Sequence, residues 1–343
     1  MTLRIALMLS LTATLTATLT SCGPKYQPQT AIVDPGPPQR VPPTIRVLDP
    51  GVTPRAPLRY RVAPGHTEVL YIELVMLRSV ESHGQGAQGG IPPIQLEVKM
   101  GPAEMTPEGF VRHPVQITQI RLSKVADRMQ PVAREQLERS LEPLLQVRGW
   151  SEMDVQGRIR RSQFEGLGSV EPRLASILSN IRAALLTVPF PAEPVGVRAR
   201  WEVDRRIQVS GAWIDQAIRY DLMSRTESTL KLKISATQTA EQQPMGNAKL
   251  EAYQASILGS AVVRLGNFTP FSEADSTSQM RIQTLVQGQP ETVRIETKTA
   301  VRLYPAEAAG EFEAAGQEST EPEPAEDPRK ITDPGKQQLR WLK

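Results

Sequence analysis

Three aspartates in the second half of the chain have the residue type and spacing for acid-base chemistry: Asp204, Asp215 and Asp221. Two carboxylates that face one another across a cleft can divide general acid and general base work between them, as in a hydrolase. All three, however, fall near the ends of predicted strands, where ordinary surface charge is the commoner role. No nucleophile, base and orienting group can be assembled from the sequence, so we predict that the chain is not an enzyme and keep a hydrolase as a third hypothesis.

Arginines gather in two stretches and are candidates for contacting an anionic partner. One stretch holds Arg158, Arg160 and Arg161, and the other holds Arg198, Arg200, Arg205 and Arg206. The side chains expected to point away from the apolar faces of their strands, and so to form a basic exterior, are Arg160, Arg198, Arg200 and Arg206. Such a surface could meet anionic lipid headgroups, peptidoglycan carboxylates or an acidic protein. The alternative is ordinary solvated strand faces in a chain with 30 arginines and 10 lysines.

The single cysteine, Cys22, offers the most specific chemistry in the chain. It stands directly after Leu19-Thr20-Ser21, at the end of an apolar, threonine-rich run that begins at Ile5 and contains no acid. This arrangement resembles the lipobox of bacterial lipoproteins. The resemblance implies cleavage between Ser21 and Cys22, a diacylglycerol on the Cys22 thiol and a third acyl chain on its free amine. The alternative is a buried structural cysteine that follows an ordinary secretory signal.

Residues 1–21 are therefore predicted to be a lipoprotein signal peptide, because one basic residue, Arg4, precedes an apolar run too short to span a bilayer. Two or three acyl chains hold a protein stably on a membrane, so we expect the membrane to be a partner through an anchor that does not cross it. Gly23 follows the cysteine, where inner-membrane lipoproteins of this class carry an aspartate. The resemblance thus implies an exported protein anchored in the outer membrane, on either of its two faces.

The composition excludes several kinds of site. One cysteine cannot build a disulfide framework, an iron–sulfur cluster or a cysteine-ligated zinc site. The three histidines, His66, His83 and His113, are isolated in the sequence, so we expect no metal site and no other cofactor. Nucleic acid is not an expected partner, because an exported protein would not meet it and only 5% of the residues are aromatic.

Residues 58–304 have the pattern of a strand-rich domain. Apolar and polar residues alternate in Ile94–Met100 and in several later stretches, which is typical of antiparallel strands with one solvated face. Thr67–Leu77 is apolar on both faces and is expected to be central. Leu58–Val62 and Met153–Phe164 are expected to be further strands, and the glycine-rich residues 84–90 a flexible hairpin loop.

Two segments have helical periodicity instead. Pro131–Val147 places its leucines on one side, and Pro143 is expected to end this helix early. Ser169–Val188 begins at a candidate N-cap and carries a continuous apolar stripe, which must lie against a sheet face. The fold class expected is mainly β (α+β): a curved antiparallel sheet or half-barrel of about eleven strands with one or two helices packed on one face.

The flanks of this domain have the composition of unpacked chain. Residues 22–57 include ten prolines and predict an extended tether. The alternative is an arm packed along the domain, with Ile45–Leu48 as an edge strand. Residues 305–343 are acidic and rich in alanine and proline, and they predict a disordered tail. The net charge of +3 therefore conceals a basic domain beside an acidic tail.

The passage Pro189-Phe190-Pro191-Ala192-Glu193-Pro194-Val195-Gly196, followed by Trp201, resembles one in a family of uncharacterised bacterial lipoproteins. There it follows a helix and opens a run of long strands. The likeness covers roughly the second half of the domain and departs at Arg198, where the family often has glycine. The resemblance implies architecture and localisation, since the family has no established activity. A second likeness, of fold only, is to periplasmic carriers whose half-open sheet wraps helices around an apolar cavity.

Two functional hypotheses follow. The first is a lipid-anchored, non-catalytic module that binds or scaffolds an envelope protein, peptidoglycan or another polymer. The second is a periplasmic carrier that holds a lipid or another apolar ligand between the sheet and the helix predicted at Ser169–Val188.

Overall fold

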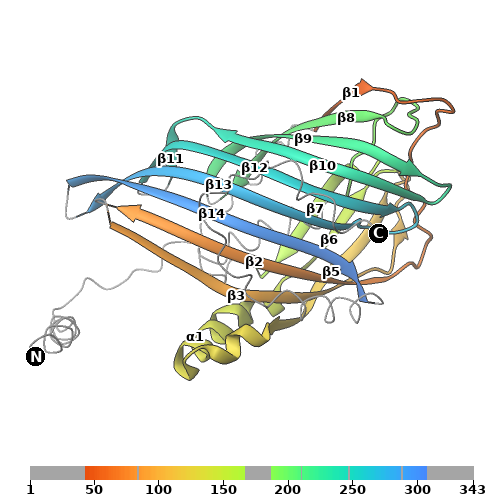
Figure 1. Ribbon diagram of the computed structural model, residues 1–343. Coiled ribbons are helices and arrows are strands. Elements are labelled where there is room, and N and C mark those ends of the chain that lie inside the picture. The colour runs from red at the N-terminus through yellow and green to blue at the C-terminus, as the bar shows by residue number, and fades with distance from the viewer. Residues whose placement is uncertain are drawn as a thin grey trace, which may run out of the picture. The chain divides into compact units, whose positions relative to one another are not determined.

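A single antiparallel sheet of 14 strands makes up nearly all of the regular structure (Figure 1). The computed structural model describes residues 43–82, 85–166, 187–209, 211–245, 248–286 and 289–306. These residues belong to the second of two compact units in the chain, which begins at Pro42. Its strands are β1 (Thr44–Asp49), β2 (Glu68–Ser82), β3 (Gln85–Met100), β4 (Glu104–Met105), β5 (Val111–Leu122), β6 (Arg148–Met153), β7 (Ile159–Glu165), β8 (Arg200–Val209), β9 (Ala212–Arg225), β10 (Thr229–Ala240), β11 (Gln243–Met245), β12 (Ala248–Arg264), β13 (Phe271–Val286) and β14 (Gln289–Pro305).

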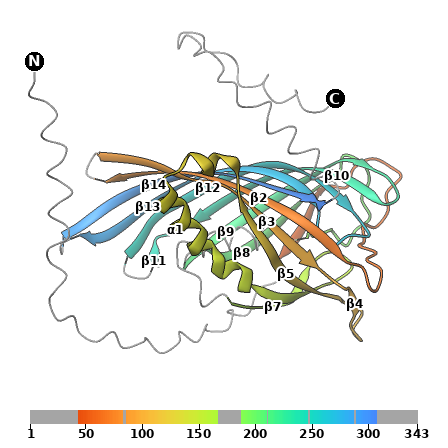
Figure 2. The same cartoon turned by 90° about the horizontal axis from the view of Figure 1, so that it is seen from below.

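The strands follow one path in the order β1-β8-β9-β10-β12-β13-β14-β2-β3-β5-β6-β7, with β11 paired to β12 and β4 paired to β5. Within the described residues the end strands β1 and β7 do not pair with each other, so the sheet is not closed. Figures 1 and 2 show that it curves along this path. The predicted mainly β fold with a curved, half-barrel-like antiparallel sheet is therefore confirmed.

The two faces of the sheet differ because side chains alternate along each strand. On β2 the buried positions are Leu70, Ile72 and Leu74, and β3 contributes Ile94, Leu96 and Val98 beside them. We call this face, which carries the core, the inner face, and the opposite one the outer face. Each fully buried aliphatic side chain contributes about 1.5–3 kcal/mol to folding. As expected, β2 lies in the interior of the sheet, between β14 and β3.

Three sequence expectations about the strands need correction. Leu58–Val62 is not a strand, although Leu58, Tyr60 and Val62 are buried in the core. Met153–Phe164 is not continuous, since a turn separates β6 from β7. Residues 85–90 of the expected loop belong to β3, where they pair with the end of β2. Glycine carries no local strand signal, and here a long neighbouring strand supplies the hydrogen bonds instead.

The first predicted helix is confirmed, including its early end. Helix α1 spans Pro131–Leu141, and the chain then tightens into a 3-10 helix, η2, at Glu142–Gln146, where Pro143 interrupts the α-helical hydrogen bonding. A further short 3-10 helix, η1 (Lys124–Arg128), precedes them. Figure 2, seen from below, shows α1 in front of the strands. Residues 169–186 of the second predicted helix lie outside the described residues. No helix in the described part of the chain is long and apolar enough to cross a membrane.

The C-terminal part of the tether expected at residues 22–57 belongs to the folded structure instead. Thr44–Asp49 forms β1 and pairs with β8 over five register positions, which is the packed-arm alternative. Residues 50–56 also bind the segment that leads into β8, through backbone bonds from Val52 to Val197 and between Ala56 and Val195. Proline lacks only its own N–H, so the residues between prolines can still pair at a sheet edge. Residues 1–42 and 307–343, which include most of the predicted tether and tail, lie outside the description.

Candidate functional site

The predicted basic exterior is not a free positive surface, because acids neutralise three of its four arginines. Arg200 on β8 contacts Asp49 of β1 at 3.2 Å, and Arg206 lies 3.6 Å from Asp215 of β9. Arg160 on β7 reaches Asp154 at 2.8 Å. The sequence could not reveal these pairs, since the acids come from other strands or from a turn.

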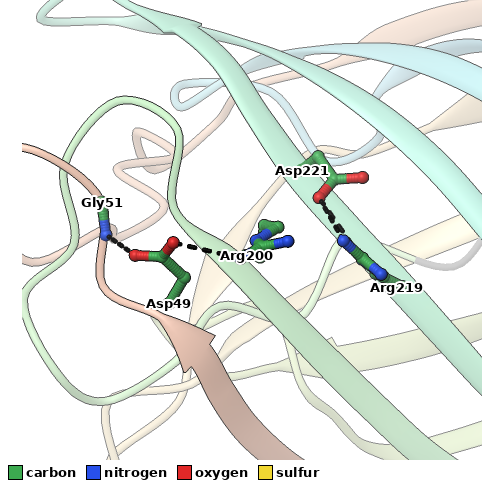
Figure 3. Close-up of polar contacts among 5 residues, drawn as sticks. All are labelled: Asp49, Gly51, Arg200, Arg219 and Asp221. Carbon is green, nitrogen blue, oxygen red and sulfur yellow. Dashed lines mark hydrogen bonds and ion pairs between the residues drawn. The ribbon is translucent and has the colours of Figure 1, made fainter.

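Figure 3 shows how the outer face beside Arg200 is built. Asp49 accepts hydrogen bonds from the Gly51 N–H, at 2.9 Å, and from Arg200. The Gly51 bond, followed by the Arg200 guanidinium, holds the pKa of the Asp49 carboxyl below its usual value. On β9 next to it, Arg219 pairs with Asp221 at 3.4 Å. Cations and anions therefore alternate across β1, β8 and β9, and exposed pairs of this kind each contribute little binding or stability.

Arg198, the fourth predicted arginine, lies in a turn, where its backbone has an unusual conformation. Its φ of 67° is in the left-handed region, and its N–H donates to the Leu222 carbonyl at 2.8 Å. Glycine adopts this conformation at little cost. The turn therefore has a geometry that favours glycine, and the Arg198 side chain is exposed there.

The three candidate aspartates do not converge. Asp204 and Asp215 are diagonal neighbours on the outer face of β8 and β9, about 7–8 Å apart, and both are exposed. Asp221 is six positions further along β9 than Asp215, which is about 20 Å. All three carboxylates lie on the outer face of β8 and β9, so they do not face one another across a cleft.

The inner face holds a feature that the sequence did not predict, a line of residues through the apolar surface in which all but Ala255 are polar. Cross-strand pairing brings its members into one row, which we call the polar row: Arg205 on β8, Gln216 on β9, Gln238 on β10, Ala255 on β12, Ser278 on β13, Thr297 on β14 and Arg78 on β2. On its core side lie Val203, Ile218, Ala236 and Ile257, two residues away along the strands. The detectable signal was the phase of Arg205, which falls between Val203 and Ile207 in the apolar alternation.

Hydrogen bonds satisfy some of the groups in the polar row. The Arg205 guanidinium donates through Nε to Gln216 Oε1 at 2.6 Å, and the Tyr253 hydroxyl donates to Gln238 Oε1 at 2.8 Å. Gln216 is buried, with 5% of its surface exposed. Burial lowers the pKa of Arg205, and it raises the pKa values of Tyr220 and Tyr253 to about 12. The row therefore places the half-buried Arg205 cation beside the neutral Gln216.

Beyond the polar row, on the side away from the core, the inner face is apolar again. We call these residues the rim row: Ile207 on β8, Ile214 on β9, Ala240 on β10, Tyr253 on β12, Met280 on β13, Ile295 on β14 and Val80 on β2. Several of them, including Ile207, Met280 and Val80, are only half-buried. The inner face therefore continues as an apolar surface past the packed core.

The passage that carries the family resemblance has a structural role. The Trp201 indole N–H donates to the Pro189 carbonyl at 3.0 Å, and the Gly196 N–H donates to the Pro50 carbonyl at 2.9 Å. Arg225 donates through Nη1 to the carbonyls of Ala56 and Val195, at 3.0 Å each. Residues 50–56, residues 189–201 and Arg225 thus form a unit that we call the clasp. It holds the N-terminal arm against β8 and β9.

His66 and His113, which are far apart in the sequence, both contact Phe268 in the loop between β12 and β13. The rings of His66 and His113 lie 5.2 Å and 4.2 Å from that of Phe268. The Glu68 carboxylate accepts the Phe268 N–H at 2.6 Å and lies 2.9 Å from His66 Nε2. Burial raises the pKa of Glu68, and these hydrogen bonds oppose that effect. The cluster holds the loop between β12 and β13 on the core.

No set of three His, Cys, Asp or Glu residues in the described part of the chain could hold a metal ion. Ser21 and Cys22, the predicted cleavage and acylation site, lie outside the described residues, as does His83.

Comparison with known proteins adds no relative. No family model matches the chain, and no curated protein does. Two solved structures align with 70% of it at 8% identity. One, described as "Asymmetric conductivity of engineered proteins", is covered over 100% of its own length with a TM-score of 0.19. The other, OpdQ of Pseudomonas aeruginosa, is covered over 99% with a TM-score of 0.21. Similarities this weak carry no argument about this chain.

Proposed function

We propose that the chain is a lipid-anchored, non-catalytic binding protein of the bacterial cell envelope, held in the outer membrane through acylated Cys22. Within that function we favour a carrier, whose inner face holds a ligand with an apolar part. The observation that supports the carrier is the rim row, an apolar surface that continues past the packed core and includes the half-buried Ile207, Met280 and Val80.

Electrostatics favours the inner face over the outer one. A scaffold for an anionic polymer would need a net positive outer surface, and acids pair with Arg160, Arg200 and Arg206. Paired surface charges attract a polyanion weakly, because their fields cancel over a few ångströms. Apolar surface that is not packed against other residues gains free energy, about 25 cal/mol per Å², from any ligand that removes it from water.

Native mass spectrometry of the full chain, released from bilayer discs, tests this carrier. We expect one lipid bound non-covalently in addition to the acyl chains on Cys22. Met280→Lys, which puts a charge in the rim row, should lower the bound fraction. Its neighbour Gln279 points to the outer face and is exposed, so Gln279→Lys is the matched control and should leave lipid binding unchanged. A wild-type chain that carries no lipid would overturn the carrier and favour the scaffold.

The anchor has a separate test. Cys22→Ala removes the only thiol in the chain, and we expect the variant to accumulate unprocessed or to leave the membrane after processing. Fractionation followed by mass measurement of the N-terminus checks this. A processed variant that stays membrane-bound would contradict the proposed lipid anchor.

A further inference from the structure

Arg205 is an unusual residue for the position it occupies. It lies on the inner face of β8, between Val203 and Ile207, and opposite Gln216 in the register of β8 and β9. Its neighbour Arg206 points to the outer face and pairs with Asp215. Two adjacent arginines on one strand therefore have opposite surroundings, an acid for one and neutral groups for the other.

Most of the N–H donors of the Arg205 guanidinium have no acceptor among the described residues and are available to a ligand. A guanidinium carries five N–H donors in a planar fork, and the described residues accept one of them, through Gln216. Among those residues no carboxylate forms an ion pair with the guanidinium, and its cross-strand neighbour on β9 is the neutral Gln216. Arg205 is half-buried, and removing a cation from water is unfavourable unless an anion or several acceptors compensate for it. A carboxylate or phosphate would match the fork, in a charge-assisted contact.

The polar row and the rim row extend this site across the strands. Gln216 and Gln238 follow Arg205 on the neighbouring strands, and the rim row runs parallel to them, two residues further along each strand. The strands from β8 to β12 cover about 15 Å at the usual interstrand spacing, which is the length of a chain of about twelve carbons. A cation therefore lies beside an apolar strip long enough for an acyl chain.

We propose that Arg205 binds the anionic head of an amphiphile whose apolar chain lies along the rim row. This rests on the proposed carrier function and specifies its ligand class: a carboxylate or phosphate attached to a long hydrocarbon chain. Charge complementarity selects the head, and the half-buried apolar residues Ile207, Tyr253 and Met280 receive the chain. A small free anion has no apolar part that could contact the rim row, so it binds weakly.

The test compares a charged and a neutral probe on the full chain in discs of zwitterionic lipid, with empty discs as background. The charged probe is 11-(dansylamino)undecanoate and the neutral one is its methyl ester. We expect the wild type to bind the carboxylate about tenfold or more tightly than the ester. Arg205→Gln should remove this preference and leave ester binding unchanged. Arg205→Lys, which keeps the charge, should retain part of it. Arg206→Gln, one residue away on the opposite face, is the matched control and should bind both probes as the wild type does.

Competition distinguishes the source of the anion. Dodecanoate should displace the charged probe, whereas acetate and inorganic phosphate at the same concentration should not. Displacement by the small anions as effectively as by dodecanoate would overturn the amphiphile. Equal binding of both probes, or a preference that survives in Arg205→Gln, would overturn the role of Arg205 and leave the carrier standing. A wild type that binds neither probe would overturn both proposals.

Discussion

Replacing His113 by phenylalanine should remove a defined part of the acid sensitivity of the fold. The His113 ring is 4% exposed and stacks on Phe268, and burial lowers its pKa from 6.5 to about 4. The folded protein therefore keeps this ring neutral until about pH 4, whereas the unfolded chain binds a proton near pH 6.5. The difference corresponds to about 3 kcal/mol of unfolding free energy, which is fully present above pH 6.5 and is lost as the pH falls to 4.

Chemical denaturation of the full chain and of His113→Phe between pH 7 and pH 4 measures this contribution. Phenylalanine keeps a ring stacked on Phe268 but cannot titrate. The wild type should therefore lose about 3 kcal/mol more than the variant over this range. Burial raises the pKa of Glu68, so its contribution has the opposite sign and is lost as the pH rises through that raised value. This term is common to both proteins and cancels in the comparison. Equal losses in the two proteins would refute a neutral, buried His113.

The clasp gives two further predictions, both measured as changes in thermal or chemical unfolding. A Cβ on Gly196 would collide with the Val52 carbonyl, so Gly196→Ala should destabilise the fold by about 1–3 kcal/mol, while Gly266→Ala, where nothing lies within 4 Å, should have almost no effect. Arg225→Met removes two charge-assisted hydrogen bonds to backbone carbonyls and should cost about 3 kcal/mol, whereas Arg219→Met, which breaks an exposed ion pair, should cost less than about 1 kcal/mol. A similar loss in the variant and its control would show that the clasp does not stabilise the arm.

The sequence predicts the strands of this fold well because the signal for a strand is local. Alternation within Ile94–Met100 depends on which face of β3 is buried, and each residue reports that by its own polarity. The same holds for α1, where Pro143 marks the end of the helix by its missing N–H. Residues 85–90 show the limit, because a glycine-rich strand has no side chains to alternate.

Pairing between distant segments is what the sequence could not supply. Arg200 meets Asp49 across 151 residues, and Arg225 meets Ala56 across 169. The acids that neutralise the predicted basic exterior could be identified only once the register of β1, β8 and β9 was known. Arg205 is an intermediate case. The alternation along β8 shows that Arg205 occupies a position on the apolar face. It does not show that the neighbour of Arg205 on β9 is the neutral Gln216.

The direction of β1 determines at which end of the sheet the described chain begins. Strand β1 runs antiparallel to β8, so the described chain reaches the sheet with Thr44 opposite Asp204 and moves away toward Arg200. Thr44 therefore lies at the end of β8 that carries Arg205 and Ile207, and the clasp holds the arm at the opposite end. Along β8 the described chain therefore passes the end that carries the rim row before it reaches Trp201 and the clasp.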